Sequence, residues 1–284
     1  MDLLFCSDVH GDESHYARLI TVAGRLRPHV IILGGDMLPD DSALDPRSMG
    51  VGQPTYVRNQ FRNHVAAMRA ASGCKNVLVI FGNHDWGSSV RATRELETEG
   101  LLNVLELDHS FEVDGLHFLG YSSTPPTPWY VKDFERLDMP GDKPPLLGGA
   151  RWDFRFSRPS QQSSTYLFNT VKTMADELAD LKPPPEPWVF VAHSPPHQSK
   201  LDRYYGDQAW GSRAVRGAIE KHQPLLSLHG HIHESPDVSG DFKDVIGRTT
   251  AVNPGQNRHR LQYATVRIDV AGRKVLEVKH GWEA

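Results

Sequence analysis

Short apolar runs alternate with amphipathic stretches through the first third of the chain. The apolar runs are 3–7, 30–33 and 77–81. The amphipathic stretches that follow them are 16–26, 61–71 and 90–96. Because buried strands give short apolar runs and surface helices give a periodic apolar face, this alternation predicts a sheet layered with helices.

The pattern changes at residue 111. Residues 111–121 place two short apolar segments on either side of Asp114-Gly115, which predicts a hairpin and the start of a second sheet. Residues 122–160 are instead rich in proline and glycine and include Trp129 and Trp152. Long segments of this kind are usually lids or binding loops, so we expect a lid or insertion at 122–160.

The rest of the chain returns to regular elements. A helix is predicted over 165–181, ended by Pro183-Pro184-Pro185, and another over 212–222. Strands are predicted at 188–192 and 225–228 and, as antiparallel partners, at 248–252, 261–270 and 274–278. Because α/β enzymes of this length commonly form one core with excursions, we expect residues 1–284 to be a single domain.

Polar and glycine-rich motifs follow five of the predicted strands. They are Asp8-Val9-His10, Gly34-Gly35-Asp36, Gly82-Asn83-His84-Asp85, His193 and Gly230-His231-Ile232-His233. Each motif alone is weak, since Asp-x-His can be a turn followed by a surface histidine. Their order favours one shared site, because open α/β sheets place their sites at the carboxyl ends of strands. A buried cluster of acids and imidazoles would be costly without a metal to neutralise it.

Taken together, these motifs resemble the pattern of the calcineurin-like metallophosphoesterase superfamily, D-x-H, G-D, G-N-H-D/E, H and G-H-x-H. The resemblance extends from residue 8 to residue 233. Within that superfamily the chain is similar to small bacterial-type members such as the class III cyclic-nucleotide phosphodiesterases. The fold that the resemblance implies is an α/β four-layer α/β/β/α sandwich, with the metal site at the strand ends between two mixed sheets.

The same resemblance implies two metal ions. One would be held by Asp8, His10, Asp36 and His233, and the other by Asp36, Asn83, His193 and His231. Asp36 would bridge them, and a hydroxide shared by both metals would attack phosphorus, so that no protein nucleophile is needed. Carboxylate, carboxamide and imidazole ligands suit divalent or trivalent transition metals such as Mn, Fe or Zn better than Mg.

His84 is expected to be catalytic together with Asp36. In the family the histidine equivalent to His84 protonates the leaving oxygen or stabilises its charge, and many members orient it with an Asp three residues after the bridging Asp. Here that position is Pro39, followed by Asp40 and Asp41, so the carboxylate partner of His84 stays open. Residues 37–41 also lack the Asp-Arg-Gly block of the Ser/Thr protein phosphatases, so we do not expect a protein phosphatase.

Substrate contacts are expected from Asn83 and His84 and from the region after His193. His197 lies in a Ser-Pro-Pro-His segment, and Arg203 and Tyr204 combine a cation with a stacking face. With the nearby Trp210 and Arg213, they would suit a phosphate attached to a planar group, although a packed surface loop would look the same. His229 is a candidate for supporting the metal ligands from behind.

Composition narrows the partners and the location. The formal net charge of −4, with both signs mixed along the chain, gives no basic field for a phosphate backbone, so nucleic acid is not an expected partner. No apolar run reaches the length of a membrane span, and the first residues lack the basic lead of a signal peptide. We therefore expect a cytoplasmic protein without a membrane partner, with Cys6 and Cys74 as reduced core thiols.

The predicted function is a dinuclear metal-dependent phosphohydrolase acting on a small phosphoester. A phosphodiesterase for an organic or nucleotide phosphodiester is preferred, and a phosphomonoesterase or nucleotidase is the alternative. A nuclease related to the double-strand-break repair phosphoesterases is third, and the absence of basic runs counts against it. The rival from another class is a catalytically silent scaffold with the same fold, but such scaffolds lose ligand residues, and every ligand position here is of the right type. The sequence leaves the oligomeric state open.

Overall fold

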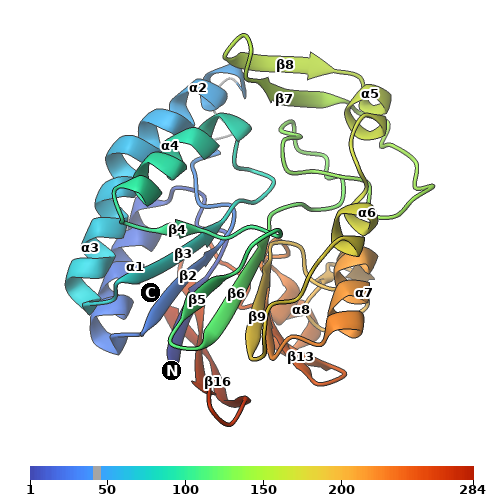
Figure 1. The fold of residues 1–284 in the computed structure, drawn as a ribbon. Helices are drawn as coiled ribbons and strands as arrows, with labels where there is room; N and C mark the ends of the chain where they lie inside the picture. The colour runs from blue at the N-terminus through green and yellow to red at the C-terminus, as the bar shows by residue number, and fades with distance from the viewer. Residues whose placement is uncertain (41–45) are drawn as a thin grey trace.

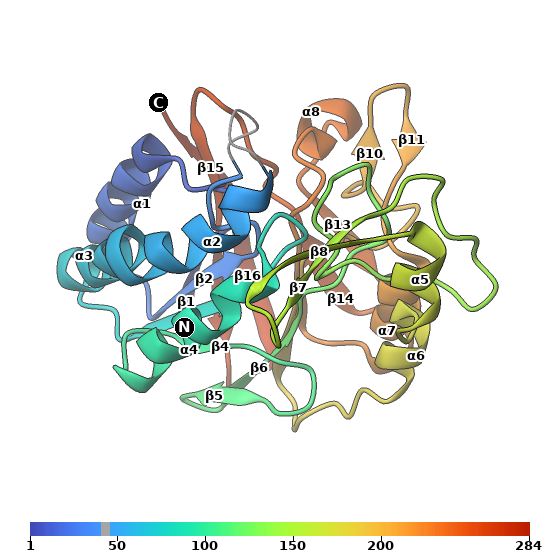
Figure 2. The same ribbon diagram turned by 90° about the horizontal axis from the view of Figure 1, so that it is seen from above.

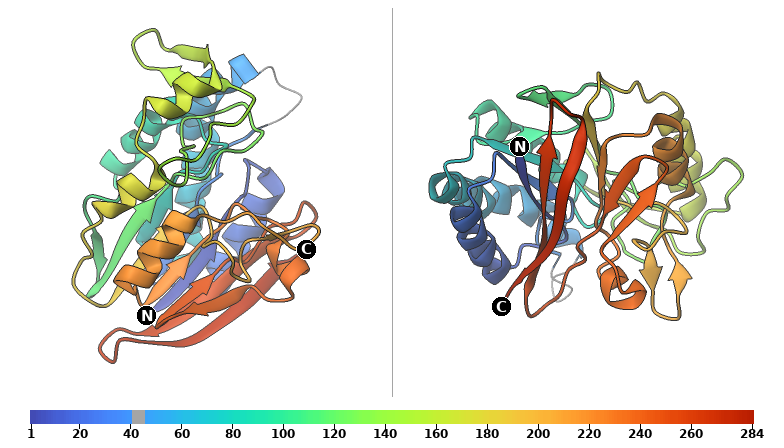
Figure 3. Two further views of the ribbon diagram at one scale, coloured as in Figure 1. Left: turned by 90° about the vertical axis from the view of Figure 1, so that its right-hand side faces the viewer. Right: turned by 90° about the horizontal axis from the view of Figure 1, so that it is seen from below.

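The structure is a computed structural model that describes residues 1–40 and 46–284. Its first sheet has six strands in the order β16-β15-β1-β2-β3-β4 (Figure 1). The strands are β1 (Asp2–Cys6), β2 (Val30–Gly34), β3 (Asn76–Ile80), β4 (Asn103–Val104), β15 (Leu261–Asp269) and β16 (Lys274–Glu283). Strands β1 to β4 are parallel, and the long β15–β16 ribbon closes one edge in antiparallel pairing (Figure 3).

The second sheet also has six strands, in the order β13-β14-β12-β9-β6-β5. The strands are β5 (Phe111–Val113), β6 (Leu116–Tyr121), β9 (Trp188–Ala192), β12 (Leu226–Leu228), β13 (Lys243–Ile246) and β14 (Thr249–Val252). The hairpin predicted around Asp114-Gly115 is confirmed, because β5 and β6 pair antiparallel across it. The four central strands are parallel, and both edge strands are antiparallel, so this sheet is mixed like the first.

Alternate residues of the strands lie in different cores, which is why the molecule has four layers. In β1, Leu4 and Cys6 face the outer helices, whereas Leu3 and Phe5 face the second sheet. The side chains of β9 alternate in the same way, since Val189 lies in the core between the sheets and Phe190 lies in the core under the outer helices. Burial on both faces explains why these segments are continuously apolar rather than alternating. The predicted α/β/β/α sandwich is confirmed (Figure 2).

Helices cover the outer faces of both sheets. Those on the first sheet are α1 (Glu13–Leu26), α2 (Pro46–Tyr56), α3 (Arg62–Ser72) and α4 (Gly87–Thr98), with a π-helical turn, Val57–Phe61, between α2 and α3. On the second sheet the helices are α6 (Met174–Ala179) and α7 (Arg213–His222), and α8 (Ser235–Ser239) follows β12. The prediction missed α2, because its Pro54 and two glycines give it no helical pattern.

The single helix predicted over 165–181 is wrong. The segment forms α5 (Ser164–Asn169) and the separate helix α6. The break comes before Thr173, whose side chain begins a new helix by a reciprocal capping box with Asp176. A capping residue outside the apolar periodicity thus ends one helix and begins another.

The predicted excursion lies outside both six-stranded sheets. Its strand β7 (Gly149–Asp153) pairs as a hairpin with β8 (Arg158–Gln162), which ends just after it. Further along the chain, outside the excursion, a second small hairpin joins β10 (Arg203–Tyr204) to β11 (Gln208–Ala209). The buried carboxylate of Asp138 fixes the excursion to the start of α7, since it accepts hydrogen bonds from Ser212 Oγ at 2.5 Å and from the Arg213 backbone at 2.8 Å.

Among the described residues, no helix is long and apolar enough to cross a membrane.

Candidate metal centre

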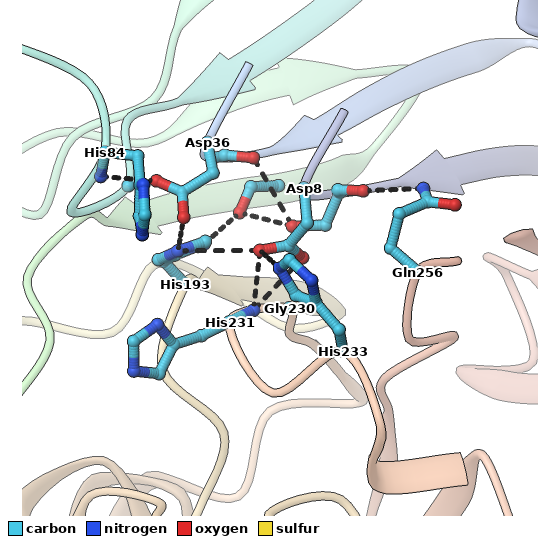
Figure 4. Close-up of polar contacts among 12 residues, drawn as sticks. Asp8, Asp36, His84, His193, Gly230, His231, His233 and Gln256 are labelled. Carbon is cyan, nitrogen blue, oxygen red and sulfur yellow. Dashed lines mark hydrogen bonds and ion pairs between the residues drawn. The ribbon is translucent and has the colours of Figure 1, made fainter. Parts of the chain in front are cut away.

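The five predicted motifs meet at one edge of the two sheets. Asp8 and Asp36 come from the turns after β1 and β2, while His193 and His231 come from those after β9 and β12 (Figure 4). Asn83 comes from the turn after β3. Backbone hydrogen bonds join the first two turns, from Asp8 N to the Gly35 carbonyl at 3.0 Å and from His10 N to the Asp36 carbonyl at 2.8 Å.

These turns are conformationally unusual. Asp8, His10, Asp36 and His231 all have positive φ, between 49° and 68°. Residues other than glycine rarely adopt this left-handed conformation, and such strain is concentrated at functional sites. These strained turns bear four of the predicted metal ligands, at some cost in stability.

One group of possible metal ligands consists of Asp8, His10 and His233, whose ligand atoms lie within 4.8 Å of one another. His233 Nε2 is 3.2 Å from Asp8 Oδ1, and it is 3.3 Å from His10 Nε2. Two imidazole nitrogens and one carboxylate oxygen thus converge on a single point. This is a donor set that transition metals accept.

A second group consists of Asp36, His193 and His231. His193 Nδ1 donates a hydrogen bond to the Gly34 carbonyl at 2.8 Å, because a carbonyl can only accept. That bond turns Nε2 toward Asp36 Oδ2, at 3.1 Å. Fixing one ring nitrogen so that the other faces the site is the usual arrangement of a metal-binding histidine.

Asp36 lies between the two groups. Its Oδ2 is 3.1 Å from His193 Nε2 in one group and 4.0 Å from His10 Nε2 in the other. Figure 4 shows the His193 ring between the carboxylates of Asp36 and Asp8, the latter at 3.9 Å. The geometry therefore fits the predicted bridging position of Asp36.

Asn83 supplies a further observation that fits a metal. Its side chain is buried, and neither its amide nitrogen nor its oxygen has a hydrogen-bond partner among residues 1–40 and 46–284. Leaving both atoms of a buried amide unpaired is costly, so such a group usually has a partner. A metal ion beside Asp36 and His193 would satisfy the oxygen.

The charges in the site favour cations. Burial would raise the pKa of Asp36, but His193 and His84 hold it well below its ordinary value. Asp8 also has a lowered pKa, because His233 outweighs its burial. Two buried carboxylates that stay ionised require positive charge nearby, and in the metal-free chain histidines provide it.

Three histidines of the site differ in the direction of their pKa shift: the pKa is raised for two of them and lowered for the third. Burial lowers the pKa of His10, but the hydrogen bond to Asp40 and the charge of Asp36 raise it to about 10. For His193, Asp36 outweighs burial and raises the pKa to about 9. His231 differs, because burial and the neighbouring His193 lower its pKa to about 3.

His84 is held on three sides. Its Nδ1 contacts Asp40 Oδ2, its ring stacks on Trp129 with centroids 4.5 Å apart, and the His10 ring lies edge-on at 4.8 Å. Asp40 is therefore the carboxylate partner that the sequence left open, while Asp41 lies outside the described residues. Asp40 also lies 3.2 Å from His10 Nδ1, and the trio of His10, Asp40 and His84 is itself close enough to hold a cation.

Two motif glycines are required by the crowding of the site. A Cβ on Gly82 would collide with Asp36 and His193, and one on Gly230 would collide with Ser7 and Asp8. Asp85, also in the motif, accepts hydrogen bonds from Gly82 N at 2.9 Å and from Leu38 N at 3.0 Å. These residues shape the turns that hold the ligand side chains.

Sequence reasoning missed two supporting glutamines. Gln53 of α2 donates to the carbonyls of Pro39 at 3.1 Å and His84 at 3.0 Å, and so ties two site turns together. Gln256 donates to the Ser7 carbonyl at 3.0 Å, just before Asp8 (Figure 4). Neither residue belongs to a motif, and only the folded chain brings them to the site.

His229 is a buried residue with its hydrogen bonds satisfied. Its Nδ1 lies 2.9 Å from the Ala192 carbonyl and 3.0 Å from that of Ser194, and its Nε2 lies 2.6 Å from Ser227 Oγ. Burial lowers its pKa to about 4, so it is neutral. Its contacts with the carbonyls on either side of His193 support the backbone that bears this residue.

Of the predicted substrate contacts after His193, His197 lines a cavity, and the Tyr204 ring lies beside that cavity, with its centroid 5.2 Å from that of Trp210. His197 lines this cavity of about 450 Å³ between the excursion and the segment before α7, together with Pro125, Pro126, Leu137, Asp138, Asp142, Lys143, Ala209, Trp210, Gly211 and Arg213. Arg203 and Tyr204 are not among the described residues that line it. The Arg203 guanidinium instead donates to backbone carbonyls near it in the chain, those of Ser199 at 3.0 Å and Asp207 at 3.3 Å.

Known proteins share this architecture. Among solved structures, TT1561 of Thermus thermophilus is 16% identical, with a TM-score of 0.55 over 99% of this chain and 97% of that one. A dimetal phosphatase from Danio rerio is 14% identical, with a TM-score of 0.53 over 94% and 92% of the two chains. At these identities the likeness concerns the fold.

Similarity in sequence adds to the likeness in fold. UPF0046 protein K07C11.7 of Caenorhabditis elegans is 32% identical over 91 residues, which are 31% of this chain and 29% of that protein, so the match spans less than a third of the relative. The family model for calcineurin-like phosphoesterases matches residues 1–235, a range that includes every motif of the site. The chain therefore belongs to the calcineurin-like phosphoesterase family.

Proposed function

We propose that this protein is a dinuclear metal-dependent phosphodiesterase acting on a small organic or nucleotide phosphodiester. The observation that supports it most is the position of Asp36 between two groups of ligand side chains, with His84 beside them and assigned to neither. This arrangement has a place for two cations and, next to them, a group that can act on a leaving oxygen.

Seven residues would hold the metals. Asp8, His10, Asp36 and His233 fit one ion, and Asp36, Asn83, His193 and His231 fit the other. Their oxygen and nitrogen donors suit Mn, Fe or Zn. Paired ions in such a site acidify water, bind phosphoryl oxygens and stabilise the charge that develops during displacement.

His84 would handle the proton of the leaving group. Its Nδ1 is engaged by Asp40, so Nε2 is the nitrogen available to the substrate. A protonated Nε2 would donate to the ester oxygen as the bond to phosphorus breaks, and Asp40 would keep the ring in the required tautomer. Trp129 would restrict the tilt of the ring.

The preference for a diester rests on the cavity lined by His197 and Trp210. The cavity is lined in part by the segment that runs from β9, past His193, to α7, and it offers prolines and an indole beside a few charged groups. An organic substituent on phosphorus would find apolar contact in it. A phosphomonoesterase is the alternative, favoured by the shared fold of the Danio rerio dimetal phosphatase.

A paired assay separates these readings. The metal-stripped protein is reconstituted with Mn, Fe or Zn and given bis-p-nitrophenyl phosphate and p-nitrophenyl phosphate at equal concentration. A diesterase should bind two metals per chain and show a higher kcat/KM for the diester. A higher value for the monoester would reject the diesterase, and weak metal binding without hydrolysis of either substrate would indicate a scaffold.

A further inference from the structure

The contact between Trp129 and His84 depends on the turn at residues 127–129, which hydrogen bonds to Glu135 hold in place. The two rings are nearly parallel, with an angle of 22° between their planes. Trp129 belongs to the excursion, whereas His84 follows β3, so local chain geometry does not hold the rings together. Something in the excursion must set the position of the indole.

The backbone of Trp129 is held through Thr127. The amide of Trp129 donates to Thr127 Oγ1 at 3.1 Å, and that hydroxyl donates to Glu135 Oε1 at 2.5 Å. The Thr127 amide donates to the other oxygen of Glu135, at 3.0 Å. Thr127 thus transmits the position of Glu135 to the residue that covers His84.

Glu135 is itself immobilised by a buried ion pair. Lys132 Nζ lies 2.8 Å from Glu135 Oε2 and donates to the Thr127 carbonyl at 2.7 Å. The two side chains are 1% and 0% exposed, respectively. A buried pair of this kind is weak as a source of stability but well suited to fixing one geometry. Here the geometry it fixes is the turn that ends at Trp129.

We propose that Thr127 is a positioning residue for the reaction. Held by the pair of Lys132 and Glu135, it places Trp129 on the face of His84 and so directs Nε2 at the leaving oxygen. This inference rests on the proposed role of His84. It concerns a part of the chain that lies outside all of the family motifs.

Thr127→Val is the central variant, and Thr127→Ser is its matched control. Valine removes the hydroxyl at constant shape, whereas serine keeps it. Glu135 Oε2 would still accept from Lys132 and from the Thr127 amide in both variants, so both are expected to fold. Thermal melts that agree with wild type verify this.

The first measurement is independent of activity. In metal-free protein, the ring protons of His84, assigned by comparison with His84→Ala, should be shifted upfield by the Trp129 ring current. Thr127→Val and Trp129→Leu should remove that shift, and Thr127→Ser should keep it. An unchanged His84 signal in Thr127→Val would overturn the positioning role.

The second measurement is a double-mutant cycle on an alkyl phosphodiester. Thr127→Val should lower kcat by roughly 10- to 100-fold, the effect of a misplaced catalytic group, with little change in KM. Combined with His84→Ala, it should cause no further loss, whereas an equal loss in both backgrounds would mean a merely structural role and reject the inference. If His84→Ala alone had no effect, the proposed function of His84 would fail, and the ring-current experiment would still decide whether Thr127 positions the ring.

Discussion

His84 and Asp40 are in direct contact through Nδ1 and Oδ2, although they are 44 positions apart in the chain. Their backbones are also tied, because Gln53 donates to the Pro39 carbonyl at 3.1 Å and to the His84 carbonyl at 3.0 Å. The two loops that bear the pair are thus fixed relative to each other. A histidine held in this way needs little reorganisation when it acts on a substrate.

Asp40→Asn should lower kcat on alkyl phosphodiesters by roughly 10- to 1,000-fold, because the amide no longer favours the required tautomer and charge of His84. Asp40 also lies 3.2 Å from His10 Nδ1, so metal affinity should fall by about 10- to 100-fold. Kinetics at saturating metal separate the two effects. A normal kcat under those conditions would exclude Asp40 as the partner of His84.

Asp36→Asn should release both metals. The carboxylate faces both ligand groups, at 3.1 Å and 4.0 Å from His193 and His10, and its charge would offset the repulsion of two cations. Elemental analysis should give well under one metal per chain, with no measurable hydrolysis. Asp180→Asn is the control, because Asp180 forms an exposed ion pair with Lys172, and this variant should still bind two metal ions per chain. Two metals at wild-type affinity in Asp36→Asn would refute the bridging position.

Metal binding should release protons at neutral pH. Because the pKa of His10 is raised to about 10 and that of His193 to about 9, both are protonated in the metal-free chain at about pH 7.5. His231, with its pKa lowered to about 3, is already neutral and has no proton to lose. Calorimetry in buffers of different ionisation enthalpy should therefore count at least two protons per chain at about pH 7.5, to which deprotonation of a metal-bound water would add, and fewer above about pH 10. Binding without proton release near neutral pH would contradict this charge state.

The same shifts predict how the metal-free chain responds to pH. Histidines whose folded pKa is raised stabilise the fold fully below their unfolded pKa, and this contribution is lost as the pH rises through the folded value. For His10 and His193 the loss should therefore begin above about pH 6.5 and be complete beyond about pH 10. Urea unfolding of the stripped protein across this range measures it, and added metal should abolish the slope.

The positions of the candidate ligand residues could be predicted from sequence because each lies next to a strand. A short apolar run locates the strand, and the carboxyl end of the strand locates the turn, so Asp8, Asp36 and His193 are found without knowledge of distant contacts. The layering of sheets and helices followed from the same runs, since strands buried on both faces are continuously apolar.

Contacts between distant loops could not be predicted in this way. Gln53 lies in a helix without helical periodicity, and Trp129 lies in a long segment without regular pattern, yet both touch the turn of His84. Asp40 and Asp41 were equivalent in sequence, and only folded geometry brings Asp40 to the imidazole. The break before Thr173 did have a local signal, the capping pair with Asp176, which the apolar pattern outweighed.

Trp210→Ala should raise KM for a diester with a large aromatic group. Its indole lines the cavity beside His197, and loss of an aromatic contact costs about 0.5–1.5 kcal/mol, or roughly 2- to 12-fold. KM for methyl p-nitrophenyl phosphate should change less than KM for bis-p-nitrophenyl phosphate. Tyr205→Ala is the control, because Tyr205 is 63% exposed and is not among the described residues that line the cavity. Equal effects of the two variants would mean that the cavity does not bind substrate.

His84→Ala tests the assignment of the leaving-group acid. The variant should keep both metals and lose roughly 10²–10⁴ in kcat on alkyl diesters, the usual size of general acid catalysis. Nitrophenyl esters should lose much less, because their leaving group departs as a stable anion and needs little protonation.

The comparison between the two substrate types is decisive because the rival roles of His84 predict different patterns. If the imidazole only stabilised charge on the phosphoryl oxygens, both substrates would lose equally. If it were instead a metal ligand, as the proximity of His10, Asp40 and His84 allows, the variant would bind fewer metals. Metal content measured beside the two rates therefore distinguishes an acid, a charge stabiliser and a ligand, and only full metal content with a leaving-group-dependent loss agrees with the acid.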